Sequence, residues 1–220
     1  MIAARIVSIQ VALPRTYGSA EAVEPHDQLW TTGFFKQPVS GPVHVGTTNM
    51  AGDGQADHEH HGGVDKAVLA YSAEHYPHWR EELNKAALPF GGFGENLTIA
   101  GLDEHSACIG DTWQAGDVVF QVSQPRQPCW KLSRRWRVDN LAARVVANGR
   151  SGWYLRVLSE GVIAPGCEIA LVERPYADWT VARASDVMHH QKRDLRLSAE
   201  LASLPPLSES WRRTLAGRKA

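Results

Sequence analysis

The chain has 220 residues, 43% of them hydrophobic and 21% charged, which suits one sizeable globular domain with a small appendage. Its formal net charge of -1 argues against bulk nucleic-acid binding. No apolar run approaches the ~18 residues that span a bilayer, and residues 1–7 lack the pattern of a signal peptide. Three cysteines without paired spacing predict no disulfide framework. We therefore expect a cytoplasmic protein with no nucleic-acid or membrane partner.

The first half of the chain alternates short strand patterns with long loops. Alternating apolar residues predict a strand over 5–11, and shorter strands are expected over 30–36 and 43–45. Residues 49–66 contain four glycines and three histidines and predict a long irregular loop, a kind of segment that usually carries function. A buried strand over 67–71 follows. Ser72 is then expected to cap a helix through Trp79 and Leu83, with Pro77 in its first turn.

The second half continues with short strands up to residue 173. A glycine-rich loop over 89–97 leads into a strand, and residues 108–122 predict two strands around a turn. Asp139 is expected to cap a helix that ends at Gly149, before two further strands. This pattern favours a mainly β fold with helices (α+β): a closed or nearly closed barrel within residues 1–174, with its core at about 25–173.

Residues 175–220 predict a separate C-terminal domain of three short helices, at about 180–189, 195–203 and 208–218. The charge distribution supports this division, because residues 181–220 carry a net charge of +4 and residues 1–180 a net charge of -5. The expected shared core of these helices consists of Leu195, Leu197, Leu201, Leu204, Trp211 and Leu215.

Cys129 lies in an unusually positive segment. Residues 118–138 contain no Asp or Glu but five cations: Arg126, Lys131, Arg134, Arg135 and Arg137. Pro128 suits the first position of a helix, which would place Cys129 in the first turn and Leu132 and Trp136 on one face. Such a setting favours a thiolate, which is a nucleophile and a soft-metal ligand. From these residues alone, a structural cysteine remains the alternative.

Two loops contain further candidate ligand-binding residues. His58, His60 and His61 are of the type that binds zinc, but consecutive side chains on a loop diverge and no distant H-x-x-x-H or C-x-x-C partner exists. Gly62-Gly63 followed by Lys66 is instead typical of backbone that approaches an anion closely. In the second loop, Gly94-Glu95-Asn96 offers a carboxylate acceptor and an amide for a heterocycle such as a pterin, or else a turn that precedes a strand.

Three motifs, in this order, resemble the signatures of the MOSC domain, the C-terminal domain of molybdenum-cofactor sulfurases. They are His61-Gly62-Gly63 with Asp65-Lys66-Ala67-Val68, then Gly94-Glu95-Asn96-Leu97, then Pro125-Arg126-Gln127-Pro128-Cys129. With the three-helix extension, the chain is most similar to the YiiM-like branch of this family. The resemblance covers nearly the whole chain.

The resemblance implies a MOSC-type β-barrel followed by a 3-alpha domain. It also implies a molybdenum cofactor, a Mo-pyranopterin, whose metal is bound by Cys129. The implied cofactor-binding residues are Cys129, Arg126, His61, Gly62, Gly63, Lys66, Gly94, Glu95 and Asn96. The implied catalytic residues are Cys129 and, as proton donors, His60 and His61. Arg134 or Arg135 could further neutralise the cofactor's phosphate.

The implied activity is reduction of N-hydroxylated compounds, such as hydroxylaminopurine-type base analogues. A separate flavin or iron–sulfur reductase would donate electrons, since the sequence has no cysteine cluster or GxGxxG loop. Two alternatives remain at this stage. One is a carrier of sulfur or of the cofactor without turnover, and the other is a zinc hydrolase that uses the histidines of residues 58–61.

Overall fold

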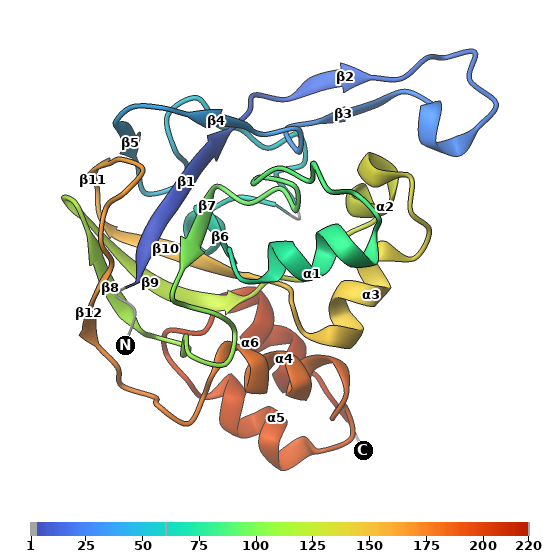
Figure 1. Cartoon of the computed structure of the whole chain (residues 1–220). Helices are drawn as coiled ribbons and strands as arrows, with labels where there is room; N and C mark the ends of the chain where they lie inside the picture. Colours follow the sequence, from blue (N-terminus) through green and yellow to red (C-terminus); the bar gives the residue numbers. More distant parts are fainter. Residues whose placement is uncertain (1–3, 60, 220) are drawn as a thin grey trace.

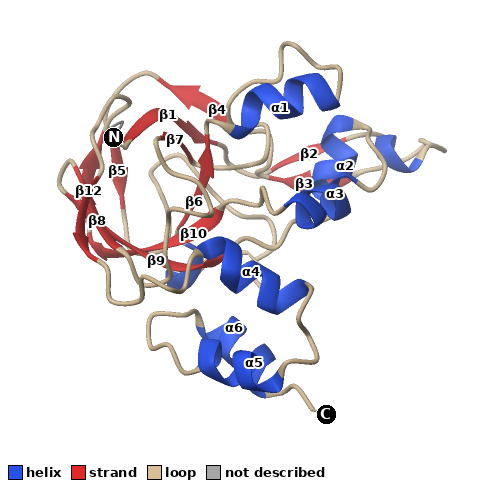
Figure 2. Cartoon of the chain, turned by 60° about the horizontal axis from the view of Figure 1, so that its bottom comes forward, coloured by secondary structure: helices blue, strands red, loops and turns tan. Residues whose placement is uncertain are grey.

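The computed structural model describes residues 4–59 and 61–219. A curled eight-stranded sheet forms a half-barrel, with strand order β12-β8-β9-β10-β6-β7-β1-β4 (Figure 1; Figure 2). Among the named strands of the described residues, β6 and β7 form the one parallel pair. The strands are β1 (Arg5–Val11), β4 (Gln37–Val39), β6 (Val68–Ser72), β7 (Leu97–Ala100), β8 (Thr112–Ala115), β9 (Val118–Pro125), β10 (Trp153–Ser159) and β12 (Ala170–Glu173). The predicted α+β class is confirmed.

Backbone hydrogen bonds bring the two sides of the half-barrel together at one end. Ile6 N–H donates to the carbonyl of Cys167 at 2.9 Å, and Ile169 N–H donates to the carbonyl of Ala4 at 2.8 Å. Two small sheets complete the strands: β11 (Gly161–Ile163) pairs with β5 (Val43–Val45), and β2 (Arg15–Tyr17) pairs with β3 (Trp30–Thr32). Figure 1 shows β2 and β3 in an arm that extends away from the barrel.

Three helices pack beside the sheet: α1 (His75–Glu82), α2 (Lys131–Trp136) and α3 (Leu141–Asn148). With the glycine-rich loop before β7 they form a second hydrophobic core, which contains Phe34, Tyr71, Tyr76, Trp79, Leu88, Phe93, Leu132, Leu141 and Val145. This core fixes the segments on either side of Cys129 and Gly94. It therefore determines the shape of the site described below.

The helix ends correct two predictions. Ser72 belongs to β6, and its hydroxyl donates to the carboxylate of Glu74 at 2.6 Å instead of capping α1. Asp139 does not cap α3, because the residue before that helix is Asn140 in a left-handed conformation with φ 58°. Pro77 does lie in the first turn of α1, and Gly149 does end α3 with φ 72°.

The three C-terminal helices are where the sequence predicts them: α4 (Val181–His189), α5 (Leu195–Ala202) and α6 (Glu209–Ala216). Their hydrophobic core is not separate, however. Val181, Leu201 and Trp211 belong to one continuous cluster with barrel residues such as Trp113. The predicted core residue Leu195 is 37% exposed instead. The helices are therefore an integral wall of the barrel.

None of the helices among the described residues is long and apolar enough to cross a membrane. All three cysteines are free, as predicted. Cys108 is buried, whereas Cys129 and Cys167 are half-buried.

The continuous core predicts that the barrel and the three helices unfold together. Leu201 is fully buried in it, so Leu201→Ala should lower the free energy of unfolding by about 2–5 kcal/mol. Urea titrations can be followed by near-ultraviolet circular dichroism, which reports the buried tryptophans, and by far-ultraviolet circular dichroism, which reports the helices. For each protein, wild type or variant, the two signals should give the same midpoint. Two separate midpoints would contradict a single cooperative unit.

Candidate functional site

A pocket opens between two glycine-containing loops and the segment that precedes α2. We call residues 49–66 the first glycine loop and residues 89–97 the second glycine loop. It contains about 620 Å³ of space not filled by protein atoms, open solvent at its mouth included. The lining residues are Thr32, Gly33, Phe34, Lys36, Gly54, Gln55, Ala56, His61, Gly62, Lys66, Leu69, Gly94, Asn96, Arg126, Gln127, Cys129, Lys131 and Tyr154. The pocket therefore brings together residues from all three sequence motifs.

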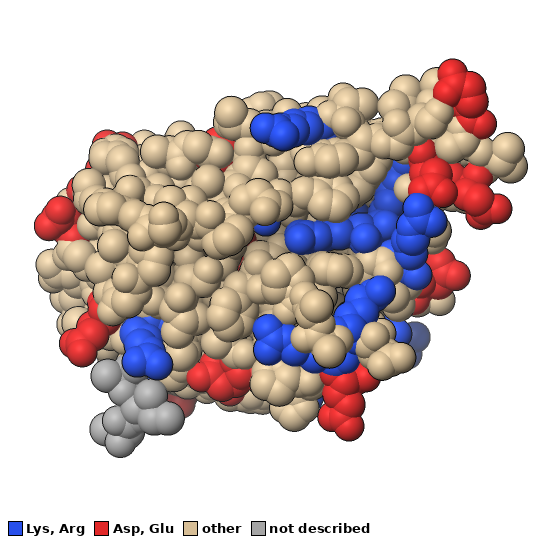
Figure 3. Space-filling view, turned by 45° about the horizontal axis from the view of Figure 1, so that its top comes forward, with Lys and Arg blue, Asp and Glu red and all other residues tan. Residues whose placement is uncertain are grey.

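The pocket is strongly positive. Four of its lining residues are the cations Lys36, Lys66, Arg126 and Lys131, and none of the described lining residues is Asp or Glu. In a space-filling view, Lys and Arg side chains form a band across one face, while Asp and Glu lie mainly towards its margins (Figure 3). This charge distribution favours an anionic ligand.

Arg126 is the most deeply held of these cations. It follows the end of β9, where its N–H donates to the carbonyl of Gly152 at 2.9 Å, and the residue is only 3% exposed. Its Nη1 is buried and has no hydrogen-bond partner among the described residues. A buried guanidinium is costly unless something pairs with it, so this group points to an anion supplied from outside the chain.

We predict that Arg126→Met raises the stability of the ligand-free protein by about 1–3 kcal/mol, because it removes a buried donor that has no partner. Lys36→Met is the matched control. Lys36 is also a buried pocket cation, but it forms an ion pair with Asp53, so its replacement should cost about 3–5 kcal/mol. Chemical denaturation of cofactor-free protein measures both. A loss of stability in Arg126→Met would contradict an unpaired charge.

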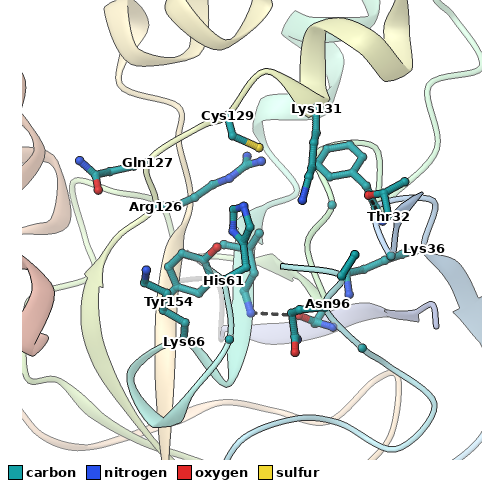
Figure 4. Close-up of a pocket in the computed structure, with 18 residues that line it drawn as sticks. Thr32, Lys36, His61, Lys66, Asn96, Arg126, Gln127, Cys129, Lys131 and Tyr154 are labelled. Carbon is teal, nitrogen blue, oxygen red and sulfur yellow. Dashed lines mark hydrogen bonds between the residues drawn. The ribbon is translucent and has the colours of Figure 1, made fainter. Parts of the chain in front are cut away.

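Cys129 lies just before α2 rather than in its first turn. The helix begins at Lys131, and the carbonyl of Cys129 accepts a hydrogen bond from Leu132 N–H at 3.2 Å. Leu132 and Trp136 do pack on one face against the second core, as predicted, and so anchor the segment. Figure 4 shows the Cys129 sulfur beside the Arg126 guanidinium, with Lys131 and His61 nearby. The positive surroundings therefore come from Arg126 and Lys131.

His61 is the histidine that the structure places in the pocket. Burial, then the charge of Lys131, lower its pKa to about 4; Lys66 and Arg126 add to the effect and Asp57 opposes it. The imidazole is therefore neutral at physiological pH in the ligand-free protein. His58 is exposed outside the pocket, and His60 lies outside the described residues.

The lowered pKa gives a stability prediction with a defined sign. Between pH 6.5 and about 4 the unfolded chain binds a proton at His61 that the folded chain does not, so the free energy of unfolding falls as the pH falls. His61→Gln should reduce this dependence. NMR titration of the His61 ring should show a midpoint near 4. A midpoint near the ordinary histidine value would contradict the proposed surroundings.

The zinc alternative has no ligand set in the described part of the chain. Within residues 4–59 and 61–219, no group of three or more His, Cys, Asp and Glu side chains is arranged to hold a metal ion. His58 and His61 face different surroundings, as expected for neighbours on one loop.

The first glycine loop brings backbone and charge to the pocket. Gly62 lines it with φ 87°, a conformation that glycine adopts without strain. Gly63 lies next to the pocket rather than in its lining and precedes a 3-10 turn at Val64–Lys66. Lys66 ends that turn and lines the pocket, where burial lowers its pKa.

Glu95 does not face the pocket, which corrects the expectation that it contacts a ligand. It is fully buried, and its carboxylate accepts hydrogen bonds from Gly91 N–H at 2.7 Å, Phe93 N–H at 3.1 Å and the Thr98 hydroxyl at 2.9 Å, as well as from the Tyr76 hydroxyl. These bonds fold the second glycine loop on itself. Glu95 thus has a structural role.

Asn96 lines the pocket, but its amide is engaged within the protein. Its Oδ1 accepts from Leu69 N–H at 3.1 Å, and its Nδ2 donates to Asp53 at 2.9 Å and to the carbonyl of Gln10 at 3.3 Å. Asp53 in turn pairs with Lys36. This buried group connects β1, β6 and both loops, so Asn96 shapes the wall rather than offering a free amide.

Gly94 permits the close approach of the two walls. Its φ is 81°, and a Cβ there would lie 2.5 Å from Cε2 of Phe34, which also lines the pocket. A side chain at this position would displace Phe34.

Arg134 and Arg135 do not line the pocket. Arg135 Nη1 donates to the carbonyls of Phe34 and Gly91, at 2.9 Å and 2.7 Å, and Arg134 donates to the carbonyls of His26 and Gln28. Both arginines attach α2 to neighbouring loops instead of neutralising a ligand.

Sequence reasoning missed Tyr154, which lines the pocket from β10. Burial raises the pKa of Tyr154, so its hydroxyl stays protonated and can donate a hydrogen bond. The available signal was the alternation of β10: Trp153, Leu155 and Val157 face the core, which directs Tyr154 and Arg156 to the other face.

The comparisons with known proteins agree with this geometry. The MOSC domain family model matches residues 57–170, and the YiiM-like, 3-alpha helix domain model matches residues 179–220. The chain therefore belongs to the MOSC family. Its architecture, a half-barrel with three appended helices, is that of the YiiM-like branch.

Several relatives align over most of this chain. It is 41% identical to the uncharacterized protein YflK of Bacillus subtilis over 202 residues, which cover 92% of this chain and 91% of that protein. A protein named Reductase in Gibberella moniliformis is 39% identical over 178 residues, covering 80% of this chain but only 32% of that longer protein. The crystal structure of YiiM from Geobacillus stearothermophilus matches with a TM-score of 0.82 and 38% identity, covering 99% of this chain and 100% of that one.

Proposed function

We propose that the chain is a molybdenum-cofactor-dependent reductase of N-hydroxylated compounds, with hydroxylaminopurine-type base analogues as the substrate class. The observation that carries the proposal is Arg126, a buried cation without a partner in a pocket that also contains Cys129 and no described carboxylate. Family membership and the relative named Reductase support the reaction class.

The residues present fit a Mo-pyranopterin. The thiol of Cys129 is a soft ligand of the kind that molybdenum accepts, and it lies beside the Arg126 guanidinium in Figure 4. Arg126, Lys66 and Lys131 would pair with the negative phosphate and dithiolene of the cofactor. Gly62 and Gly94 line the pocket without adding a side chain to it. When bound, the cofactor supplies a metal centre that exchanges two electrons with the substrate.

The overall reaction is R–NH–OH + 2e⁻ + 2H⁺ → R–NH₂ + H₂O. The N–O bond breaks, nitrogen gains the electron pair and a proton, and the hydroxyl leaves as water after receiving the second proton. The chain must therefore provide a proton close to the departing oxygen.

Two described residues are placed to provide it. Tyr154 holds its proton and lines the pocket. His61 is neutral in the ligand-free protein because of burial and the neighbouring cations. An anion paired with those cations would remove their repulsion, raise the pKa of His61 and let it act as the acid. We assign the proton to His61, with Tyr154 as a hydrogen-bond donor that orients the substrate oxygen.

Electrons must come from another protein in this proposal. The three cysteines are free and scattered through the sequence, so they offer no iron–sulfur site. The relative named Reductase is about three times longer than its matching region. For this chain we propose a separate flavin or iron–sulfur reductase.

We predict that Cys129→Ala, produced in a host that makes the cofactor, loses molybdenum and pterin fluorescence along with hydroxylamine reduction. Elemental analysis and fluorescence of the purified protein measure this. Cys167→Ala is the matched control, since Cys167 is also half-buried and free but lies outside the described pocket lining. Molybdenum retained by Cys129→Ala would exclude the ligand assignment.

The same samples distinguish a reductase from a carrier of sulfur or of the cofactor that has no turnover. A carrier would hold cyanide-labile sulfur on Cys129, or cofactor, without reducing N-hydroxylated substrates when a reductant is supplied. That result would exclude the reductase proposal while leaving the pocket assignment in place.

A further inference from the structure

The three C-terminal helices contact the pocket indirectly, through the first turn of α6. We propose that residues 206–210 form a brace that sets the positions of Lys66 and Arg126, with Asp65 as a positioning residue. The inference depends on the pocket being an anion site but not on the reaction proposed above.

The brace holds the first glycine loop through Asp65. The Asp65 Oδ2 accepts a hydrogen bond from Glu209 N–H, the first residue of α6, at 3.0 Å. Its Oδ1 accepts from Arg156 Nε at 3.0 Å, and its backbone carbonyl accepts from the Ser123 hydroxyl at 2.6 Å. Asp65 directly precedes Lys66, so these bonds fix the backbone from which Lys66 enters the pocket.

The brace also holds the end of β9. Ser208 N–H donates to the carbonyl of Ser123 at 2.9 Å, and the Ser210 hydroxyl donates to Gln124 Oε1 at 3.4 Å. Ser208 is fully buried and caps α6. Arg126 lies two residues beyond Gln124. The same turn of helix thus contacts both segments that deliver cations to the pocket.

The two segments differ in how much they need this support. Arg126 follows directly on a strand of the sheet, whereas Lys66 follows a loop with two consecutive glycines. On its C-terminal side Lys66 is two residues from β6, and its N–H donates to the carbonyl of Gly63 at 3.0 Å. The contacts of Asp65 add the anchor on the N-terminal side of Lys66, next to the glycines. Among the described residues, the C-terminal helices donate one hydrogen bond to the Asp65 carboxylate, from the N–H of Glu209 in α6.

A single substitution removes that contact while keeping the helix. Glu209 is the first residue of α6, a position where proline is well tolerated, and Ser208 before it has φ -55° and ψ 147°, which suits a residue that precedes proline. Glu209→Pro deletes the N–H and places the ring against the Asp65 carboxylate. Glu209→Ala is the matched control, because it removes the same charge and the ion pair with Arg213 but keeps the N–H.

The electrostatic field at Cys129 provides a readout that needs no cofactor. Cys129 is alkylated with anionic iodoacetate and with neutral iodoacetamide, and peptide mass spectrometry gives each rate at Cys129 and at Cys167. The iodoacetate-to-iodoacetamide rate ratio reports the positive charge near the sulfur. Lys66→Ala sets the scale for loss of that cation. Because Lys66 lies across the pocket from the Cys129 sulfur (Figure 4), we expect about a twofold fall in the ratio, the size for one charge at about 10 Å in water.

We expect Glu209→Pro and Asp65→Ala each to lower the ratio at Cys129 towards the Lys66→Ala value, by up to about twofold, with the double variant no lower than either single one. Glu209→Ala should leave the ratio unchanged, and the ratio at Cys167 should not change in any variant. If the role of Asp65 were purely electrostatic, Asp65→Ala would raise the ratio at Cys129, because the substitution removes a negative charge.

An alkylation-rate ratio at Cys129 that is unchanged or raised in folded Asp65→Ala would overturn the brace. This variant is informative because the substitution leaves the sequence of α6 unaltered. Circular dichroism confirms that each variant is folded. Since cofactor-free protein is used throughout, absence of molybdenum or of reductase activity in the wild type would refute the proposed function without affecting this result.

Discussion

A positive charge held away from water organises this protein. Arg126 reaches the pocket from the end of β9, only 3% exposed and without a partner for its Nη1 among the described residues. Its backbone N–H is held by the carbonyl of Gly152 in the segment before β10. The described lining contains no carboxylate. His61 is neutral mainly because of burial and Lys131, and Arg126 adds a smaller contribution.

The polar residues of the two glycine loops act mainly on the loops themselves. Glu95 accepts hydrogen bonds from two N–H groups of its own loop, and Asn96 joins β6 to the Lys36–Asp53 pair. These bonds hold glycine-rich backbone in one conformation without placing a carboxylate in the pocket. The negative charges needed for folding are thereby kept apart from the positive surface that faces a ligand.

Much of the architecture could be predicted from the sequence, because apolar periodicity and proline or glycine boundaries depend on local structure. The three C-terminal helices and the packing of Leu132 with Trp136 are examples. His61 and Lys66 lie far from Cys129 in the sequence, yet all three line one pocket, as the motif resemblance implied.

Tertiary contacts determined what the sequence could not show. Whether Glu95 turns towards a ligand or towards its own loop depends on Tyr76, which comes from a helix nineteen residues earlier. The shared core of barrel and helices could not be foreseen, since the charge division between them suggests separate units. Tyr154 was missed because a tyrosine in a strand is most often a packing residue.

The continuous core also defines which piece of this chain can be moved as a module. A graft or truncation that ends near residue 174, at the apparent domain boundary, would expose the apolar side of β9 and its neighbours, which α4 covers. Fusion at either end of the whole chain leaves that surface covered. Engineered electron-transfer fusions should therefore keep the barrel and its helices as one indivisible block and attach new domains outside it.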